Sequence, residues 1–189
     1  SGEAQGKEGQ PFCWVRVSEL SAYTFPEANQ AILKACLLPR RCVITPEYDS
    51  LEDAELKLRS LFSQGHQLVL FRQPQLSQTE FSRFIHYLDV RFPDFAKRVV
   101  LAGRYALSLG PGFGVHLPSR LASELNGRPI ESDHLLGVSC HNEVEMKQAE
   151  RLGADYITLS PVCVTASHPE RAKLGWSKFK ALVAKSQRP

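Results

Sequence analysis

A serine and a histidine stand at the end of an apolar run that has the composition of a buried strand. The run 135–138 is followed directly by Ser139, Cys140 and His141. Histidine changes its charge near neutral pH and suits general acid or base catalysis, and a serine hydroxyl can orient a ligand or an imidazole. We therefore take His141 as the candidate catalytic residue and Ser139 as a candidate substrate-binding residue. The alternative for His141 is a histidine beside a helix N-terminus that binds nothing.

Cys140, next to His141, raises the question of a thiol–imidazole nucleophile. Neighbouring residues of a strand point to opposite faces, and the sequence shows no third group to orient the imidazole. We therefore disfavour a cysteine nucleophile.

Two further polar residues occupy the ends of predicted strands. Arg72 follows the apolar run 67–71, and His116 lies within the run 114–117. Arg72 either binds an anion or closes a salt bridge, and His116 either contacts a ligand or is a structural histidine with satisfied hydrogen bonds. We include both among the candidate substrate-binding residues.

The elements that position these residues alternate between strands and helices. Apolar runs predict strands at 42–45, 67–71, 98–101, 114–117, 135–138 and 156–159. Helical spacing predicts helices at 51–63, 77–92, 105–109, 118–125, 144–152 and 176–184, with Ser77 as an N-cap. Short connections between such units favour a parallel sheet, either doubly wound or a (β/α)8 barrel, with ligands beyond the carboxyl ends of the strands. We expect an α/β fold of TIM-barrel type, incomplete at about six βα units and lacking its last two strands.

Residues 1–38 do not follow this pattern. Residues 12–17 predict one strand, and 26–35 predict one helix opened by Pro26. One strand and one helix cannot bury their own apolar faces, so this segment is an appendage or the remnant of another domain. Pro39 marks the junction, which gives domains at 1–38 and 39–189.

Composition excludes several classes of partner. A net charge of +3 over 189 residues is too mild for a nucleic acid polymer or an anionic membrane surface, and no apolar run reaches the ~20 residues of a membrane span. The N-terminal ten residues lack the apolar region of a secretory signal. The five cysteines are an odd number without CxxC spacing, which favours reduced thiols and a cytoplasmic location.

Several motifs in register carry a family resemblance. These are VITP at 43–46, Arg72, GVHLPS at 114–119, GVSCH at 137–141, GADYITLSPV at 153–162 and LGW at 174–176. Together they resemble the thiamin phosphate synthase/TenI superfamily of barrels over residues 41–189, about three-quarters of a family barrel. The resemblance implies a TIM barrel that binds a small phosphorylated heterocycle in thiamin biosynthesis.

The chain departs from the synthases of this superfamily at their charged ligands. Of the family's Gln-x-Arg-x-Lys pattern only Arg72 remains, Ala102-Gly103 replaces an Asn-Asp pair, and an acidic magnesium ligand falls near Leu121. The resemblance therefore implies no synthase activity, because these ligands hold Mg²⁺ and pyrophosphate.

The TenI branch of the superfamily tautomerises a thiazole phosphate carboxylate with a histidine that His141 matches. The loop that carries a Thr-x-Thr-Lys pattern in the synthases here contributes Thr165, Ser167 and His168 as candidate substrate-binding residues. Their polar atoms suit phosphate or carboxylate oxygens.

A second resemblance covers the N-terminal segment. GKEGQP at 6–11, Trp14 and FPEAN at 25–29 resemble the C-terminal end of MutT-type Nudix hydrolases, which cleave oxidised guanine nucleoside triphosphates. Glu8 matches a glutamate near that family's metal centre, and Asn29 an asparagine that reads the purine. The Nudix signature helix is missing, so we expect no metal site and no cofactor in this chain; Mg²⁺ would belong to a full-length Nudix domain.

These observations lead to two hypotheses. The first is a TenI-like barrel that binds a phosphorylated thiazole-type heterocycle, with His141 in proton transfer. The second is a non-catalytic binding or regulatory module of a MutT-like 8-oxo-dGTP diphosphatase in nucleotide-pool sanitation. We lean toward an enzyme for a full-length parent protein, and we expect unpaired strand edges to promote homo-oligomers.

Overall fold

The computed structural model describes residues 6, 8–9, 11–164 and 173–189. The chain divides into two compact units, Ser1–Leu38 and Pro39–Pro189.

The described residues of the first unit form helices where they are regular. These are two 3-10 helices and one α-helix: η1 (Val17–Ala22), η2 (Glu27–Asn29) and α1 (Gln30–Leu37). The prediction of a strand at 12–17 is wrong: residues 11–16 have no regular structure, and Val17 begins η1. The described part of this unit offers no neighbouring strand to pair with, and the Trp14 side chain is 86% exposed. Apolar composition alone does not form a strand without such a partner.

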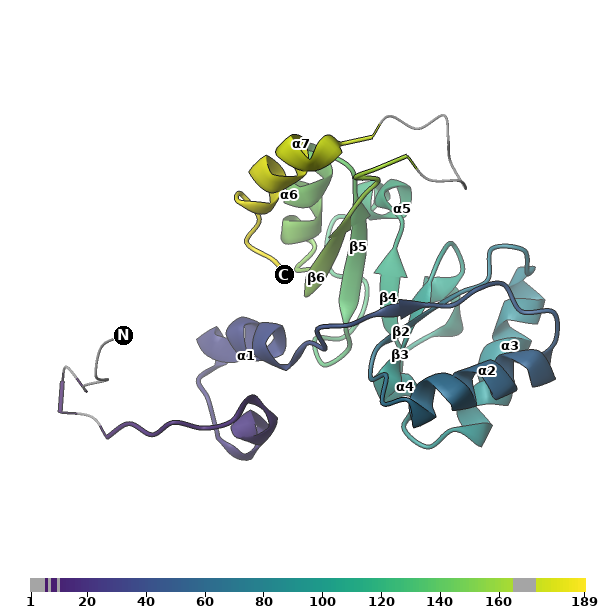
Figure 1. Cartoon of the computed structure of the whole chain (residues 1–189), viewed down its shortest axis with the longest axis horizontal. Helices are drawn as coiled ribbons and strands as arrows, with labels where there is room; N and C mark the ends of the chain where they lie inside the picture. The colour runs from purple at the N-terminus through teal and green to yellow at the C-terminus, as the bar shows by residue number, and fades with distance from the viewer. Residues whose placement is uncertain (1–5, 7, 10, 165–172) are drawn as a thin grey trace. The chain divides into compact units, whose positions relative to one another are not determined.

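The second unit is built on a parallel sheet. Its strands are β1 (Val43–Ile44), β2 (Val69–Arg72), β3 (Val99–Ala102), β4 (Gly114–Leu117), β5 (Leu136–Cys140) and β6 (Tyr156–Leu159). Neighbours in the sheet are neighbours in sequence, from β1 to β6, and every pair is parallel (Figure 1). A doubly wound sheet would reverse its order at a switch point. The sequential order therefore gives a partial TIM-barrel-like α/β fold, as predicted.

Helices follow the strands, as the sequence predicts. They are α2 (Leu51–Ser63), α3 (Gln78–Arg91), α4 (Phe95–Arg98), η3 (Ala106–Leu109), α5 (Ser119–Glu124), α6 (Glu143–Arg151) and α7 (Gly175–Val183). Ser77 is the N-cap of α3, as predicted: its Oγ accepts from the Glu80 amide at 3.3 Å, and the Glu80 carboxylate accepts from the Ser77 amide at 2.8 Å. The one-turn helix α4 was not predicted, because four residues are too few for a periodic signal.

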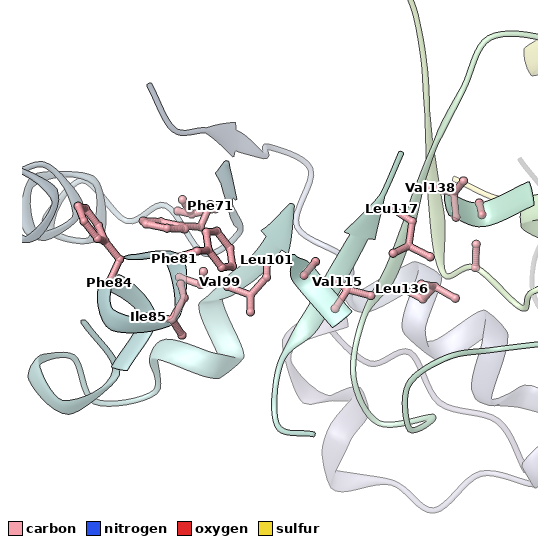
Figure 2. Packing of buried hydrophobic residues seen from close by; sticks show 14 of the residues in the cluster. Phe71, Phe81, Phe84, Ile85, Val99, Leu101, Val115, Leu117, Leu136 and Val138 are labelled. Carbon is pink, nitrogen blue, oxygen red and sulfur yellow. The ribbon is translucent and has the colours of Figure 1, made fainter. Parts of the chain in front are cut away.

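One face of the sheet packs against the helices and forms the hydrophobic core. We call it the helix-covered face; its buried strand residues are Val69, Phe71, Val99, Leu101, Val115, Leu117, Leu136, Val138 and Cys140. Figure 2 shows Phe71 and Leu101 close to Phe81 of α3, and the Phe71 and Phe81 rings lie 5.9 Å apart. Each fully buried side chain of this size stabilises the fold by roughly 1.5–3 kcal/mol.

The alternate residues of the same strands point to the opposite face, which we call the inner face. These residues are Leu70, Arg72, Val100, Ala102, Gly114, His116, Gly137, Ser139, Tyr156 and Thr158. This face is apolar on β2 and β3 apart from Arg72, and becomes polar on β4 to β6. The alternation therefore places the candidate residues Arg72, His116 and Ser139 on one face.

A buried ion pair fixes the beginnings of β5 and β6. Arg128 and Asp155 pair at 2.8 Å, with 19% and 9% of their side chains exposed. The same Asp155 oxygen accepts from the Leu136 amide at 2.8 Å, and Arg128 also donates to the carbonyls of His134 and Gly153. These bonds set where both strands start and so set the register of the polar residues that follow.

Among the residues that the structure describes, no helix has both the length and the apolar character needed to cross a membrane.

Candidate active site

Four polar side chains meet on the inner face of β4, β5 and β6. His116 Nε2 lies 2.9 Å from Ser139 Oγ and 3.5 Å from Thr158 Oγ1, and His116 Nδ1 lies 3.2 Å from the Tyr156 hydroxyl. The His116 and Tyr156 rings also stack, with centroids 5.6 Å apart. The sheet register explains this meeting, because His116 is paired with Gly137, Gly137 with Tyr156, and Ser139 with Thr158.

Gly137 makes room for the His116–Tyr156 pair. It is buried between the two residues in the register, and a Cβ at this position would lie 2.5 Å from His116 Nδ1 and still closer to the Tyr156 ring. Real Cβ atoms do not approach other atoms this closely, so a side chain at 137 would force His116 and Tyr156 to shift, and their close approach depends on glycine.

Burial keeps this cluster uncharged. His116 is 6% exposed, and its burial lowers its pKa from 6.5 to about 4. Burial also raises the pKa of the Tyr156 phenol well above its usual range. His116 is therefore a neutral imidazole near pH 7, where it can give or accept a hydrogen bond but offers no positive charge to an anion.

His141 lies at the carboxyl edge of the sheet, just after β5. Its Nδ1 is 2.5 Å from the carbonyl oxygen of Ser160, which follows β6, and the Ser160 amide donates to the Cys140 carbonyl at 3.1 Å. The His141 amide donates to Glu145 Oε2 at 2.7 Å, and Asn142 caps α6 by accepting from the Glu145 amide at 3.0 Å. The half-buried imidazole is thus held by the Ser160 carbonyl after β6, and the His141 backbone is held by the first turn of α6.

The structure separates the candidate residues of β5 into two groups. The Ser139 hydroxyl contacts the imidazole of His116 and has no hydrogen bond to His141. Cys140 points into the helix-covered face, fully buried, and its pKa is raised to about 12 by burial and by the nearby charges of Glu145 and Glu150. A thiol in that environment is not a nucleophile, in agreement with the interpretation from the sequence.

Arg72 lies in a cavity at the carboxyl ends of β2, β3 and β4. The cavity measures about 310 Å³ and is lined by Arg72, Gln73, Pro74, Phe81, Ala102, Gly103, Arg104, Tyr105 and Pro118. Its two charged residues are the arginines, and no carboxylate is among the residues that line it. The sequence analysis did not predict Arg104 as a site residue. Its signal was a basic residue two positions after the end of β3, where ligand-binding residues of a parallel sheet lie. His141 does not line this cavity, so the structure does not bring Arg72 and His141 into one pocket.

The remaining candidates fall elsewhere. Thr165, Ser167 and His168 lie outside the described residues. Glu8 and Asn29 belong to the first unit, where Glu8 is exposed and Asn29 is half-buried at the end of η2.

One group of three potential metal ligands occurs in the described part of the chain. Ligand atoms of Glu131, Asp133 and His134 lie within 4.8 Å of one another, and Asp133 already pairs with His134 at 2.7 Å. The two carboxylates are exposed, and the group precedes β5, away from the carboxyl edge. It does not form a metal centre for the site described here.

The fold and the polar residues define a class of protein, an α/β protein with a partial TIM-barrel-like parallel sheet. Its candidate site lies on the inner face of the sheet and at the carboxyl ends of the strands. The family model described as thiamine monophosphate synthase (TMP-TENI) matches residues 41–189. The chain belongs to this family.

Three similar proteins carry related descriptions. The chain is 28% identical over 153 residues to a provisionally named thiamine-phosphate synthase 2 of Aquifex aeolicus, covering 80% of this chain and 82% of that protein. It is 29% identical over 181 residues to the thiamine-phosphate synthase of a Synechococcus strain, covering 93% of this chain and 48% of that protein. The crystal structure of thiamine phosphate pyrophosphorylase from Bacteroides thetaiotaomicron aligns with a TM-score of 0.44 and 19% identity, covering 76% of this chain and 64% of that chain.

The chain therefore spans about half of the Synechococcus relative. That match covers more of the chain than residues 41–189 contain, so it extends into the first unit. None of these comparisons supports the Nudix resemblance of residues 1–38, which stays a prediction.

Proposed function

We propose that the second unit binds a small phosphorylated heterocycle of the thiazole type and moves a proton on it with His141. The family supports the ligand class, and the position of His141 at the carboxyl edge of the sheet supports the role. In a tautomerisation a proton leaves one position of the heterocycle and another is delivered elsewhere, so one base that becomes an acid completes the cycle.

The hydrogen bond between His141 and Ser160 carries this proposal. A carbonyl oxygen can only accept, so the neutral imidazole places its proton on Nδ1 and donates it to the Ser160 carbonyl. Nε2 then keeps its lone pair and is the base. The Glu145 carboxylate holds the His141 backbone through the amide, and the ring is oriented before a ligand arrives.

The cavity at the carboxyl ends of β2, β3 and β4 suits an anionic group, because Arg72 and Arg104 supply positive charge and Tyr105 supplies apolar surface. His141 does not line this cavity, so a single ligand has to extend from the cavity to His141 to contact both. Ser139 supplies a hydroxyl on the inner face. His116 is buried behind Ser139, so we assign it to positioning the hydroxyl rather than to direct contact with the phosphate.

The same cavity disfavours synthase chemistry. Ala102 and Gly103 line it where the synthases place an Asn-Asp pair, and the position expected for a third, acidic metal ligand falls near Leu121. Without these oxygen ligands, the residues that line the cavity do not fit a Mg²⁺–pyrophosphate complex.

The test is isomerisation of thiazole phosphate carboxylate by the protein and by His141→Asn. Asparagine keeps an N–H donor near the position of Nδ1, so the bond to the Ser160 carbonyl is retained while the base is removed. We expect His141→Asn to lose at least about 100-fold in kcat, the usual contribution of a general base. His86→Asn, on the exposed face of α3, is the matched control and should retain full activity. An active His141→Asn protein would refute the role of His141.

One observation favours a second function, binding without catalysis. The loss of carboxylates from the mouth leaves a cavity with two arginines and no metal ligand, which suffices to hold an anion. If wild type and His141→Asn bind the thiazole phosphate carboxylate equally and neither isomerises it, the unit is a binding module.

A further inference from the structure

The Tyr156 hydroxyl has a single hydrogen-bond partner among the described residues, the Nδ1 atom of His116. Tyr156 is 6% exposed, so solvent does not offer a replacement. Its phenol stays protonated, because burial raises its pKa. The phenol proton therefore either goes to His116 Nδ1 or remains buried without an acceptor.

The neutral imidazole of His116 has two tautomers, and hydrogen-bond satisfaction distinguishes them. With the proton on Nε2, the Tyr156 hydroxyl donates to Nδ1, and Nε2–H donates to Ser139 Oγ at 2.9 Å. With the proton on Nδ1, that proton points at the phenol oxygen, and the phenol proton is left unpaired in the interior. Leaving a buried donor unpaired is costly, so the Nε2–H tautomer is favoured.

We propose that Tyr156 is a positioning residue that holds His116 as its Nε2–H tautomer and thereby makes the Ser139 hydroxyl a hydrogen-bond donor to the ligand. Ser139 Oγ accepts from His116, so its own proton is not used within the cluster. Ser139 is partly exposed on the inner face, whereas His116 and Tyr156 are buried behind it. Gly137 contributes to this arrangement, because a side chain at 137 would clash with the His116 and Tyr156 rings.

The inference rests on the proposed function for the identity of the ligand, and it narrows the ligand's chemistry. The atom next to Ser139 must be a hydrogen-bond acceptor, such as a carboxylate oxygen or an unprotonated ring nitrogen. A ligand that presents an N–H at this point would leave two donors facing each other, which is a strong basis for rejection.

The tautomer can be read without turnover. The protein is labelled with ¹⁵N-histidine, and two-dimensional NMR correlates the carbon-bound protons of the imidazole with its two nitrogens. The nitrogen chemical shifts then report whether Nδ1 or Nε2 is protonated. We expect wild-type His116 to be protonated on Nε2 at pH 7. Protonation on Nδ1 in the wild type would overturn the proposal outright, whatever the variants do.

Two variants then test the cause. Tyr156→Phe keeps the ring and removes the hydroxyl, so we expect the Nε2–H preference to be lost and Nδ1–H to become populated. Ser139→Ala leaves the phenol in place, so Nε2–H should persist. If Tyr156→Phe leaves the tautomer unchanged, or Ser139→Ala switches it, Tyr156 does not hold the ring. The matched control is Tyr87→Phe. Tyr87 lies on α3, and its hydroxyl donates to the Glu55 carboxylate of α2 at 2.9 Å, so removing it should change nothing at His116.

Binding of thiazole phosphate carboxylate separates this inference from the proposed function. Tyr156→Phe removes the donor role of Ser139, so it should weaken binding of thiazole phosphate carboxylate about three- to tenfold, the effect of one neutral hydrogen bond. We expect kcat to change less than KM. A tautomer switch in a protein that never binds this compound would leave the positioning role intact and contradict the proposed function. Unchanged binding despite a switched tautomer would contradict the donor role of Ser139.

Discussion

The two faces of the parallel sheet are made from the same strands and have opposite character. The helix-covered face is apolar without interruption from Val69 on β2 to Cys140 on β5. The inner face carries Arg72 at one side and the His116, Ser139, Tyr156 and Thr158 cluster at the other. Adjacent residues in sequence, such as Gly137 and Val138, therefore belong to different chemical environments.

This difference separates stability from function within one sheet. The helix-covered face obtains its free energy from buried apolar area, which does not depend on the direction of any single bond. The inner face depends on directed hydrogen bonds between residues of three strands, so small changes in geometry alter what it can bind. Substitutions on the two faces should accordingly have different signatures.

The largest effect on stability is expected on the helix-covered face. Phe71→Ala removes a fully buried ring and should lower the free energy of unfolding by about 3–5 kcal/mol. Urea unfolding followed by circular dichroism measures this loss. Leu56→Ala, at a position of α2 that is 69% exposed, is the control and should stay within about 0.5 kcal/mol of wild type. Equal losses for the two variants would contradict the assignment of the core.

The next effect depends on pH and comes from His116. Its pKa is about 4 in the folded state and 6.5 in the unfolded chain, so the unfolded state binds more protons between these values. Stability is therefore lost as pH falls from 6.5 toward 4, by up to about 3 kcal/mol from this residue. Unfolding free energies measured across this range should fall more steeply for wild type than for His116→Gln. Parallel profiles for the two proteins would show that His116 is not buried in its neutral form.

A smaller loss is expected where the inner face is most crowded. Gly137→Ala places a methyl group against His116 and Tyr156, so the strands must shift, at a cost of about 1–3 kcal/mol. In Gly127→Ala the added carbon meets nothing within 4 Å, which makes it the matched control. Thermal unfolding compares the two variants, and a Gly137→Ala protein as stable as the control would mean that the two rings are not in contact.

The smallest effect on stability is expected at Arg72. Its exposed guanidinium has no hydrogen-bond or ion-pair partner among the described residues, so Arg72→Met should change the free energy of unfolding by about 0.5 kcal/mol or less. Binding of inorganic phosphate, measured by calorimetry, should nevertheless weaken. Arg83→Met on α3 is the control for the loss of one positive charge. Equal phosphate binding by both variants would exclude Arg72 from the anion site.

The sequence predicts the strands and helices of the second unit well because each has a local cause. The helix at 51–63 has clear helical periodicity, and the structure gives it the same bounds, with Ser50 as its N-cap. The strand expected at 12–17 has an apolar composition similar to that of the strands in the second unit. It has no neighbouring strand in the described residues of the first unit. Pairing is a non-local property, and a single run of residues does not contain it.

The site is only partly visible in the sequence for the same reason. His141 and Ser139 follow a recognisable apolar run, so their place at the end of β5 could be predicted. The contact between His116 and Tyr156 joins residues 40 positions apart and depends on the register of three strands. Gly137 offered the one local signal, because a glycine inside a strand often marks a close approach.

The central claim is that Nε2 of His141 takes a proton from one position of the ligand and delivers a proton to another. Incubating thiazole phosphate carboxylate with the protein in D₂O and following all of its carbon-bound protons by NMR tests this step directly. The account predicts deuterium incorporation with wild type and with His86→Asn, and none above the buffer rate with His141→Asn. Equal incorporation with His141→Asn and wild type, or no incorporation by a wild-type protein that binds the compound, would contradict it.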